Sequence, residues 1–284
     1  TYGEILLSED KSIEKHKINQ EISKKNYEII KSENEIEKWL MEAEELGELA
    51  IDTETSSLDP HQAKLVGISL STKIGKAVYI PIGHKKGENL VEKKVLQKLK
   101  PILEDKSIKK IGQNIKFDYI IFFHRGIDIT PMEDTMLMSY VLDAGKNRHN
   151  MDTLSVLHLG HKPIAFKELV GTGKKEINFS EVNIIDAKDY AAEDADITFR
   201  LYKIFLKNLK IEKLINIYEI FEKPLIKILA MMEINGVKLD TSSLKKLSIK
   251  FDKKIKSLES EIFKLSKKEF NIASPKQLGE IIYN

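Results

Sequence analysis

An apolar run that ends in two carboxylates constrains the fold more than any other stretch of this chain. Leu49 to Ile51 are all apolar, which is typical of a strand that is buried on both faces. Asp52 and Glu54 follow two residues apart, and because side chains alternate along a strand, both should point to the same face. The sequence therefore predicts two carboxylates side by side at the end of a core strand.

Two carboxylates at such a position need a chemical explanation. Like charges this close repel each other and raise a pKa, unless a cation lies between them. Their hard oxygen ligands suit Mg²⁺ or Mn²⁺. A solvated strand end with acidic turn residues is the alternative, and for an isolated Asp-x-Glu it is favoured by about ten to one. Carboxylates elsewhere in the chain decide between these interpretations.

The composition of the whole chain sets few limits on function. Its 284 residues favour two domains over one. A net charge of +2 does not by itself indicate a nucleic-acid partner, so a basic surface would have to be local. The lack of cysteine excludes a disulfide framework and a cysteine-ligated zinc site, and it is compatible with a reducing cytoplasm. No apolar run approaches the roughly 20 residues of a membrane-spanning helix.

Three segments with different patterns define the predicted domain organisation. Residues 1–26 are rich in lysine and glutamate with little periodicity, and they are predicted to be a lead-in or linker. Residues 27–210 hold a short strand, a capped helix, three strands in sequence and then alternating helices and strands, the last strand at 127–130. This order predicts an α/β fold in which a mixed sheet carries helices on both faces. Residues 211–284 are predicted to be helical.

Two more carboxylates stand where a solvated acid is not expected. Asp118 lies in a predicted helix that follows a short strand. Asp194 falls on the apolar stripe of a long predicted helix, one turn after Tyr190. An ionised aspartate on the inward face of a helix is unfavourable unless it is paired or bound to a metal. Glu193 and Asp196 fall off this stripe and are predicted to be solvated.

The four carboxylates and Tyr190 together fit a site for two divalent ions. Two ions about 4 Å apart can activate a water molecule and stabilise the leaving oxygen of a phosphodiester. Tyr190 can orient the attacking water by a hydrogen bond. The sequence has neither a Gly-x-Ser-x-Gly elbow nor a Walker-type phosphate loop, and without cysteine it gives no sign of a covalent nucleophile.

Two lysine-rich regions are candidates for contact with a phosphate backbone. Segment 171–175 combines glycine and lysine, as a mobile basic loop does, although a solvated surface loop fits these residues at least as well. The predicted helix 241–268 is strongly basic, which suits DNA backbone contact, but a solvated helix pair is about as good an interpretation. Because the chain begins at Thr1 and ends at Asn284 inside an unfinished element, we expect a fragment of a longer protein.

Three motifs resemble the exonuclease motifs of the bacterial DNA polymerase I family. They are Asp52–Asp59, Gly112–Asp118 and Tyr190–Asp196, and they are similar to the branch of the DEDD superfamily that has tyrosine rather than histidine near the last aspartate. Segments Pro224–Asp240 and Asn271–Gly279 look like the start of the polymerase domain, including the thumb.

The resemblance implies a ribonuclease-H-like 3′–5′ proofreading exonuclease domain that uses two Mg²⁺ or Mn²⁺ ions and releases 5′-mononucleotides from DNA. In that family the residues that match Asp52, Glu54 and Asp194 bind the metals. The counterpart of Asp118 supports the second metal, and the counterpart of Tyr190 positions the water. The resemblance also implies contacts with the DNA strand at five positions: Leu58, Gln113, Asn114, Arg148 and Phe166.

The implied partners are a single-stranded or frayed DNA 3′ end and the rest of a polymerase. The domain is expected to act as a monomer in the bacterial cytoplasm, at the nucleoid and away from membranes, and without palm and fingers it should not polymerise. Leu58 and Phe166 would pack on unpaired bases, although Phe166 fits a core position as well. A ribonuclease-D-like RNA exonuclease and a catalytically silent DNA-binding fold stay open as alternatives. The histidines are assigned no role.

Overall fold

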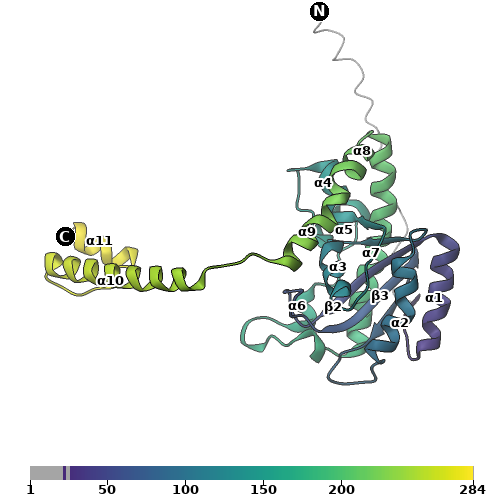
Figure 1. The fold of residues 1–284 in the computed structure, drawn as a ribbon, viewed down its shortest axis with the longest axis horizontal. Helices are drawn as coiled ribbons and strands as arrows, with labels where there is room; N and C mark the ends of the chain where they lie inside the picture. The colour runs from purple at the N-terminus through teal and green to yellow at the C-terminus, as the bar shows by residue number, and fades with distance from the viewer. Residues whose placement is uncertain (1–21, 24–25, 284) are drawn as a thin grey trace, which may run out of the picture. The chain divides into compact units, whose positions relative to one another are not determined.

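The chain divides into two compact units, Thr1–Ile234 and Asn235–Asn284. The computed structural model describes residues 22–23 and 26–283, so the lead-in predicted for residues 1–26 lies almost wholly outside the described residues. The first unit holds a sheet with helices around it, and the second unit holds two helices (Figure 1). Among the described residues, no helix is both long enough and apolar enough to span a bilayer.

Six strands form one mixed sheet in the first unit. They are β1 (Tyr27–Ile29), β2 (Glu48–Thr55), β3 (Leu65–Lys73), β4 (Lys76–Pro81), β5 (Lys109–Gly112) and β6 (Met132–Asp134). In the order β1-β4-β3-β2-β5-β6, β3 is antiparallel to both of its neighbours and the other pairs are parallel. The predicted fold class is confirmed. The strand predicted at 127–130 is wrong, because the partner of β5 begins only at Met132.

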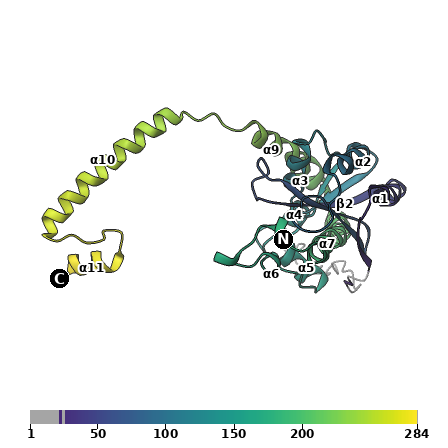
Figure 2. The same cartoon turned by 90° about the horizontal axis from the view of Figure 1, so that it is seen from below.

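Helices cover both faces of this sheet. Those of the first unit are α1 (Glu33–Leu46), α2 (Glu92–Glu104), α3 (Ile115–Phe123), α4 (Thr135–Asp143), α5 (Met151–Leu159), α6 (Phe166–Val170), α7 (Ile184–Ile211), α8 (Ile215–Ile217) and α9 (Lys223–Asn235). Shorter turns are η2 (Gly173–Lys175), η3 (Phe179–Glu181) and η4 (Tyr218–Glu222). Around β2, helices α2 and α3 lie on one side, and α5 and α7 lie on the other (Figure 2).

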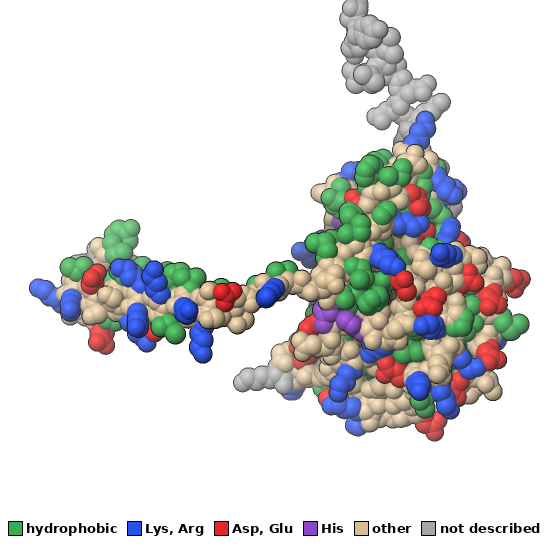
Figure 3. All heavy atoms as spheres, viewed as in Figure 1, with side chains coloured by type: hydrophobic (Ala, Val, Ile, Leu, Met, Phe, Trp, Pro, Cys, Tyr) green, Lys and Arg blue, Asp and Glu red, His purple; other side chains and the backbone are tan. Residues whose placement is uncertain are grey.

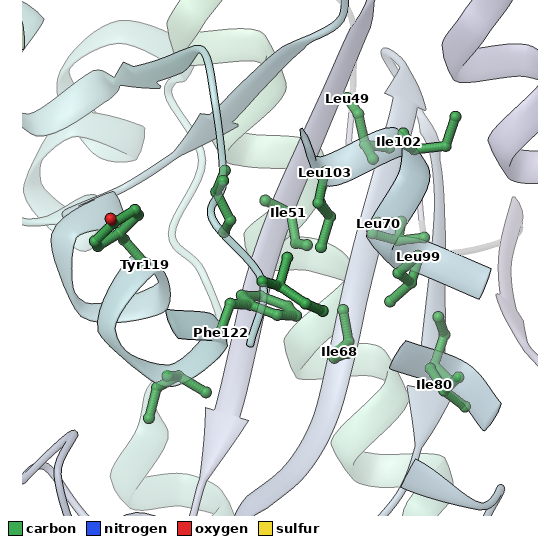
Figure 4. Packing of buried hydrophobic residues seen from close by; sticks show 14 of the residues in the cluster. Leu49, Ile51, Ile68, Leu70, Ile80, Leu99, Ile102, Leu103, Tyr119 and Phe122 are labelled. Carbon is green, nitrogen blue, oxygen red and sulfur yellow. The ribbon is translucent and has the colours of Figure 1, made fainter. Parts of the chain in front are cut away.

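Alternation along β2 decides which face of the sheet carries the carboxylates. Leu49 and Ile51 pack in the core cluster that includes residues of α2 and α3 (Figure 4). Ala50 packs instead in the cluster that includes residues of α4 and α7. Because Asp52 and Glu54 continue the alternation of Ala50, their side chains emerge on the face that α7 covers.

Helix α7 is enclosed along most of its length, because strands of the sheet contact it on one side and α4 and α5 contact it on the other. The prediction that Glu193 and Asp196 are solvated is therefore wrong, and both are buried. Asp196 accepts hydrogen bonds from the Tyr27 hydroxyl over 2.9 Å and the Gly75 N–H over 2.7 Å. It also pairs with Arg200 over 3.0 Å. These partners replace the water that the carboxylate loses on burial.

Residues 211–234, which the sequence assigned to the second segment, pack on the first unit. Ile226 and Ala230 of α9 belong to its main core cluster. Lys223 of α9 pairs with the buried Glu133 over 2.6 Å. The predicted domain boundaries stay predictions, while the contacts of the chain divide it after Ile234.

The second unit contains α10 (Thr241–Ser266) and α11 (Pro275–Tyr283). Asp240 caps α10, since its carboxylate accepts a hydrogen bond from the Ser243 N–H over 3.0 Å. The helix ends where Lys267 adopts a left-handed φ of 54°. All of α10 is described and none of its residues is buried, so its lysines are accessible on the surface of this unit (Figure 3).

Candidate metal centre

Three carboxylates converge between the end of β2 and the middle of α7. One oxygen each of Asp52, Glu54 and Asp194 can be chosen so that all three lie within 4.8 Å of one another. Glu54 and Asp194 are buried, and Asp52 is partly exposed. The two β2 residues meet Asp194 because their strand positions face α7, as the alternation of Ala50 requires. The structure therefore brings together three of the four predicted carboxylates directly.

Asp118 approaches the same place from a different direction. β5 pairs with β2 only as far as Ala50 and Ile111, so beyond this point none of the described strands pairs with β2 on that side. There the Thr53 N–H donates to Asp118 Oδ1 over 3.0 Å, and the Thr53 hydroxyl donates to the same oxygen over 2.5 Å. Asp118 thus satisfies a backbone group that a longer β5 would have bonded. Burial, and then repulsion from Asp52, raises the pKa of Asp118.

The electrostatics of this cluster favour a cation. Burial raises the pKa of Asp52 to about 7. Burial, and then repulsion from the neighbouring carboxylates, raises the pKa values of Glu54 and Asp194. Within the part of the chain that the structure describes, no lysine, arginine or histidine forms an ion pair with these groups. An all-carboxylate donor set without histidine or cysteine suits a hard divalent ion rather than zinc.

Tyr190 stands one helical turn before Asp194, and its hydroxyl lies near that carboxylate. Burial and the nearby Asp194 charge raise the pKa of Tyr190, so the phenol stays protonated and can donate. Phe166 and Phe179 stack in parallel beside it, with ring centroids 6.0 Å apart and an angle of 7°. Phe166 also meets the Tyr190 ring edge-on at 6.1 Å. Tyr190 thus links the carboxylate cluster to the aromatic pair of Phe166 and Phe179.

The five predicted DNA-contact residues lie in different surroundings. Leu58 is 93% exposed in the connection after β2, and Phe166 is 45% exposed on α6, which is more than a core residue shows. Asn114 and Arg148 are exposed. Gln113 is less available, because its amide donates to the His149 carbonyl over 2.8 Å and accepts from Thr135. The hydrogen bond of Gln113 holds His149, which directly follows Arg148 in the chain.

Asp134, which the sequence reasoning did not single out, organises the start of two helices beside the site. Its carboxylate accepts hydrogen bonds from the N–H groups of Asn114 over 3.0 Å and Ile115 over 3.1 Å. It also caps α4 by accepting from the Met136 N–H over 2.9 Å. Asn114 needs this support because its φ of 58° is left-handed. The sequence signal that could have identified this cap is an aspartate directly before Thr135, where α4 begins.

Glu193 was also missed, because its burial depends on a segment far away in the sequence. Its Oε1 lies 3.0 Å from His161 Nε2, and its Oε2 accepts a hydrogen bond from the Ile164 N–H over 2.7 Å. These bonds fasten the segment that precedes α6 to α7. The segment leads directly to Phe166, so His161 has a structural role where the sequence suggested none.

Comparison with known protein families identifies the family of the chain. Residues 27–210 match the family of 3′–5′ exonuclease domains known as DNA_pol_A_exo1. The chain is 42% identical over 269 residues to DNA polymerase I of Rhizobium leguminosarum, with 87% of this chain and 26% of that protein covered. It is 39% identical over 266 residues to DNA polymerase I of Pseudomonas aeruginosa, with 91% and 29% covered. The chain thus spans less than a third of the length of these relatives.

The fold has a counterpart among solved structures. The POL domain of Pol1 from M. smegmatis, in complex with DNA primer-template and dNTP, aligns with a TM-score of 0.69. The alignment covers 89% of this chain and 40% of that chain, at 19% sequence identity. At this identity the likeness concerns the fold alone.

Proposed function

Because this chain belongs to the polymerase-A family of 3′–5′ exonuclease domains, we propose that it hydrolyses the 3′-terminal phosphodiester of DNA and releases 5′-mononucleotides. The observation that carries this proposal is the convergence of Asp52, Glu54 and Asp194 within 4.8 Å. Three carboxylates held this close, with raised pKa values and no paired cation among the described residues, favour a divalent metal.

The carboxylates would hold two Mg²⁺ or Mn²⁺ ions. Asp52, Glu54 and Asp194 would bind the ions directly, and Asp118 would support the second from the free edge of β2. When bound, such ions lower the pKa of water and stabilise charge on the leaving oxygen. The role of Asp118 requires that Thr53 keep it in place, since Thr53 donates both of the hydrogen bonds that fix its Oδ1.

Tyr190 would orient the attacking water. Its raised pKa keeps the hydroxyl protonated across the physiological range, so the group can donate a hydrogen bond as well as accept one. The hydroxyl lies against Asp194, which places it at the edge of the carboxylate cluster. A phenol that is already held in this orientation needs little rearrangement when substrate arrives.

The substrate would be a single-stranded or frayed DNA 3′ end. The exposed side chains of Leu58 and Phe166 would pack on the terminal bases, which requires no particular base sequence. Asn114 and Arg148 would contact the sugar–phosphate strand, and Gln113 would act through its bond to His149. We further propose that the domain acts as a monomer within a longer polymerase, at the nucleoid of a bacterial cytoplasm.

A labelled-substrate assay tests this function. A 5′-labelled single-stranded DNA and an RNA of matching sequence are incubated with Mg²⁺ or Mn²⁺ and with wild type or Asp118→Ala. Asp252→Ala, which removes an exposed carboxylate of the second unit, is the matched control. We expect a DNA ladder that shortens from the 3′ end, that the control preserves and that Asp118→Ala abolishes.

Two other outcomes would overturn the proposal. Preferential shortening of the RNA would assign the chain to the ribonuclease-D-like alternative. Retained DNA binding without cleavage of either substrate would indicate a silent exonuclease fold.

A further inference from the structure

Ser69, in the middle of β3, carries a hydroxyl that the fold leaves without a partner. The residue is fully buried, and its Oγ has no hydrogen-bond partner among the described residues. Buried hydroxyls in native proteins are nearly always hydrogen-bonded, because loss of water without compensation is unfavourable. An exception at a fully enclosed position therefore requires an explanation.

The strand register places this hydroxyl beside the carboxylate cluster. Ser69 on β3 is the direct cross-strand partner of Asp52 on β2, and Gly67 is the partner of Glu54. Directly opposed residues project from the same face, with Cβ atoms about 4.5–5.5 Å apart. A serine hydroxyl and an aspartate carboxylate at that separation can reach hydrogen-bond distance by side-chain rotation alone. Ser69 thus borders the metal ligands on the face that α7 covers.

The other hydroxyls on this face of β3 and β4 are already engaged. Ser71, two residues further along β3, donates to backbone carbonyls, with Lys76 O at 2.9 Å. Tyr79 lies 2.7 Å from His84 Nε2. The other ring nitrogen, Nδ1, lies 3.0 Å from the Val182 carbonyl and must carry the hydrogen there, so Nε2 accepts from the Tyr79 hydroxyl. Ser69 differs from both because its hydrogen has no such acceptor.

We propose that Ser69 is a positioning residue of the metal centre, and this inference rests on the proposed function. Its hydroxyl donates to the carboxylate oxygen of Asp52 that does not face the ion and so fixes the orientation of the ligand. A carboxylate has two oxygens and can serve a metal with one while it accepts a hydrogen bond with the other. The hydroxyl would then be unpaired only until Asp52 turns toward the ion.

A purely steric role for Ser69 makes a different prediction. If position 69 required only a small side chain under α7, alanine would serve equally well. Ser69→Ala would then remove an unpaired hydroxyl and leave metal binding unchanged. In a positioning role, alanine leaves the metal-free fold intact or slightly more stable but weakens metal binding. Metal affinity therefore distinguishes the two roles where stability alone does not.

The test is a calorimetric titration of the whole chain with Mn²⁺, without DNA. Wild type is compared with Ser69→Ala and with Ser69→Cys, whose thiol keeps the shape of the side chain but is larger and only a weak donor. Ser71→Ala is the control on the same strand. We expect the Mn²⁺ dissociation constant to rise at least about tenfold in both Ser69 variants, as is usual when a partner of a metal ligand is lost. Ser71→Ala should match wild type.

The possible outcomes separate this inference from the proposed function. Wild-type Mn²⁺ binding with an unchanged dissociation constant in Ser69→Ala overturns the role of Ser69 alone. A wild-type chain that does not bind Mn²⁺ overturns both the metal centre and the role of Ser69. If Ser69→Ala fails to fold, Ser69→Cys decides, because its thiol still fills the position of the hydroxyl.

Discussion

Thr53 donates two hydrogen bonds to a single oxygen of Asp118, one from its backbone N–H over 3.0 Å and one from its hydroxyl over 2.5 Å. The residue lies between Asp52 and Glu54 on β2, and its side chain leaves the strand on the opposite face. The segment Asp52–Glu54 therefore presents two candidate metal ligands on one face of the strand. Thr53, between them, fixes the carboxylate of Asp118. The register of β2 controls both.

Removal of the Thr53 hydroxyl should loosen Asp118 without disturbing the strand. Thr53→Val keeps the β-branched shape and the backbone hydrogen bond, so only the side-chain bond is lost. We expect the free energy of unfolding to fall by about 1.5–3 kcal/mol, the usual worth of a hydrogen bond to a charged group. Cleavage of DNA should slow by about tenfold.

Urea denaturation and the rate of DNA cleavage would check this expectation. Thr53→Ser, which retains the hydroxyl, serves as the control and should keep most of the wild-type activity. Equal denaturation midpoints and equal rates for Thr53→Val and wild type would show that the backbone bond alone holds Asp118.

The metal-free protein should lose stability as pH rises. The pKa of Asp52 is raised from 3.8 to about 7 because burial disfavours its charged form. A carboxyl whose pKa is higher in the folded state binds more protons there, so its contribution is fully present below about pH 3.8 and is lost as pH rises through about 7. Urea denaturation in EDTA from pH 5 to pH 8 should show this fall.

The same experiment with Asp52→Asn isolates the contribution of Asp52. An amide does not titrate, so the decline between pH 5 and pH 8 should become shallower in this variant. A variant profile that is as steep as that of wild type would assign the pH dependence to other groups.

Added Mn²⁺ should reverse this loss of stability. A ligand that binds only the folded state stabilises it by about 2.7 kcal/mol at a concentration 100 times its dissociation constant. Asp194→Ala should reduce the Mn²⁺-induced rise in Tm, and it should raise the stability of the metal-free protein because one repelling charge is gone. Asp252→Ala, in the second unit, should leave the Mn²⁺ effect unchanged. An equal Mn²⁺ shift in Asp194→Ala and wild type would contradict a role for Asp194 in metal binding.

Local sequence patterns predicted the parts of the fold that depend on neighbouring residues. The run from Leu49 to Ile51, followed by Asp52 and Glu54, gave the strand, its burial and the shared face of the two carboxylates, because alternation is a property of the strand itself. The position of Asp194 on the inward side of α7 followed from helical periodicity in the same way.

Features that depend on distant segments were not predictable in this way. The burial of Asp196 requires Tyr27, Gly75 and Arg200, of which only Arg200 lies nearby in the sequence. Periodicity describes one inward stripe, but α7 is covered on two sides, so the stripe underestimates what is buried. The partner of Asp118 could not be anticipated either, because it depends on where β5 stops pairing with β2.

The segment before α6 offers a test of how Phe166 is positioned. Glu193 on α7 holds this segment through His161 and the Ile164 N–H. His161→Ala removes the first of these bonds and leaves the carboxylate cluster untouched, so Mn²⁺ affinity should not change. Because Phe166 follows directly, we expect its ring to shift relative to Tyr190 and to pack less well on a terminal base.

The expected kinetic result is a KM for single-stranded DNA that rises about fivefold in His161→Ala, with a smaller change in kcat. Lost packing on the substrate weakens binding in the ground state and the transition state alike, which appears in KM rather than in kcat. His161→Gln supplies an amide donor to Glu193 and should restore much of the wild-type KM. A fall in kcat with unchanged KM would instead mean that the segment acts on the carboxylates or on Tyr190, the groups proposed to hold the metal ions and the attacking water.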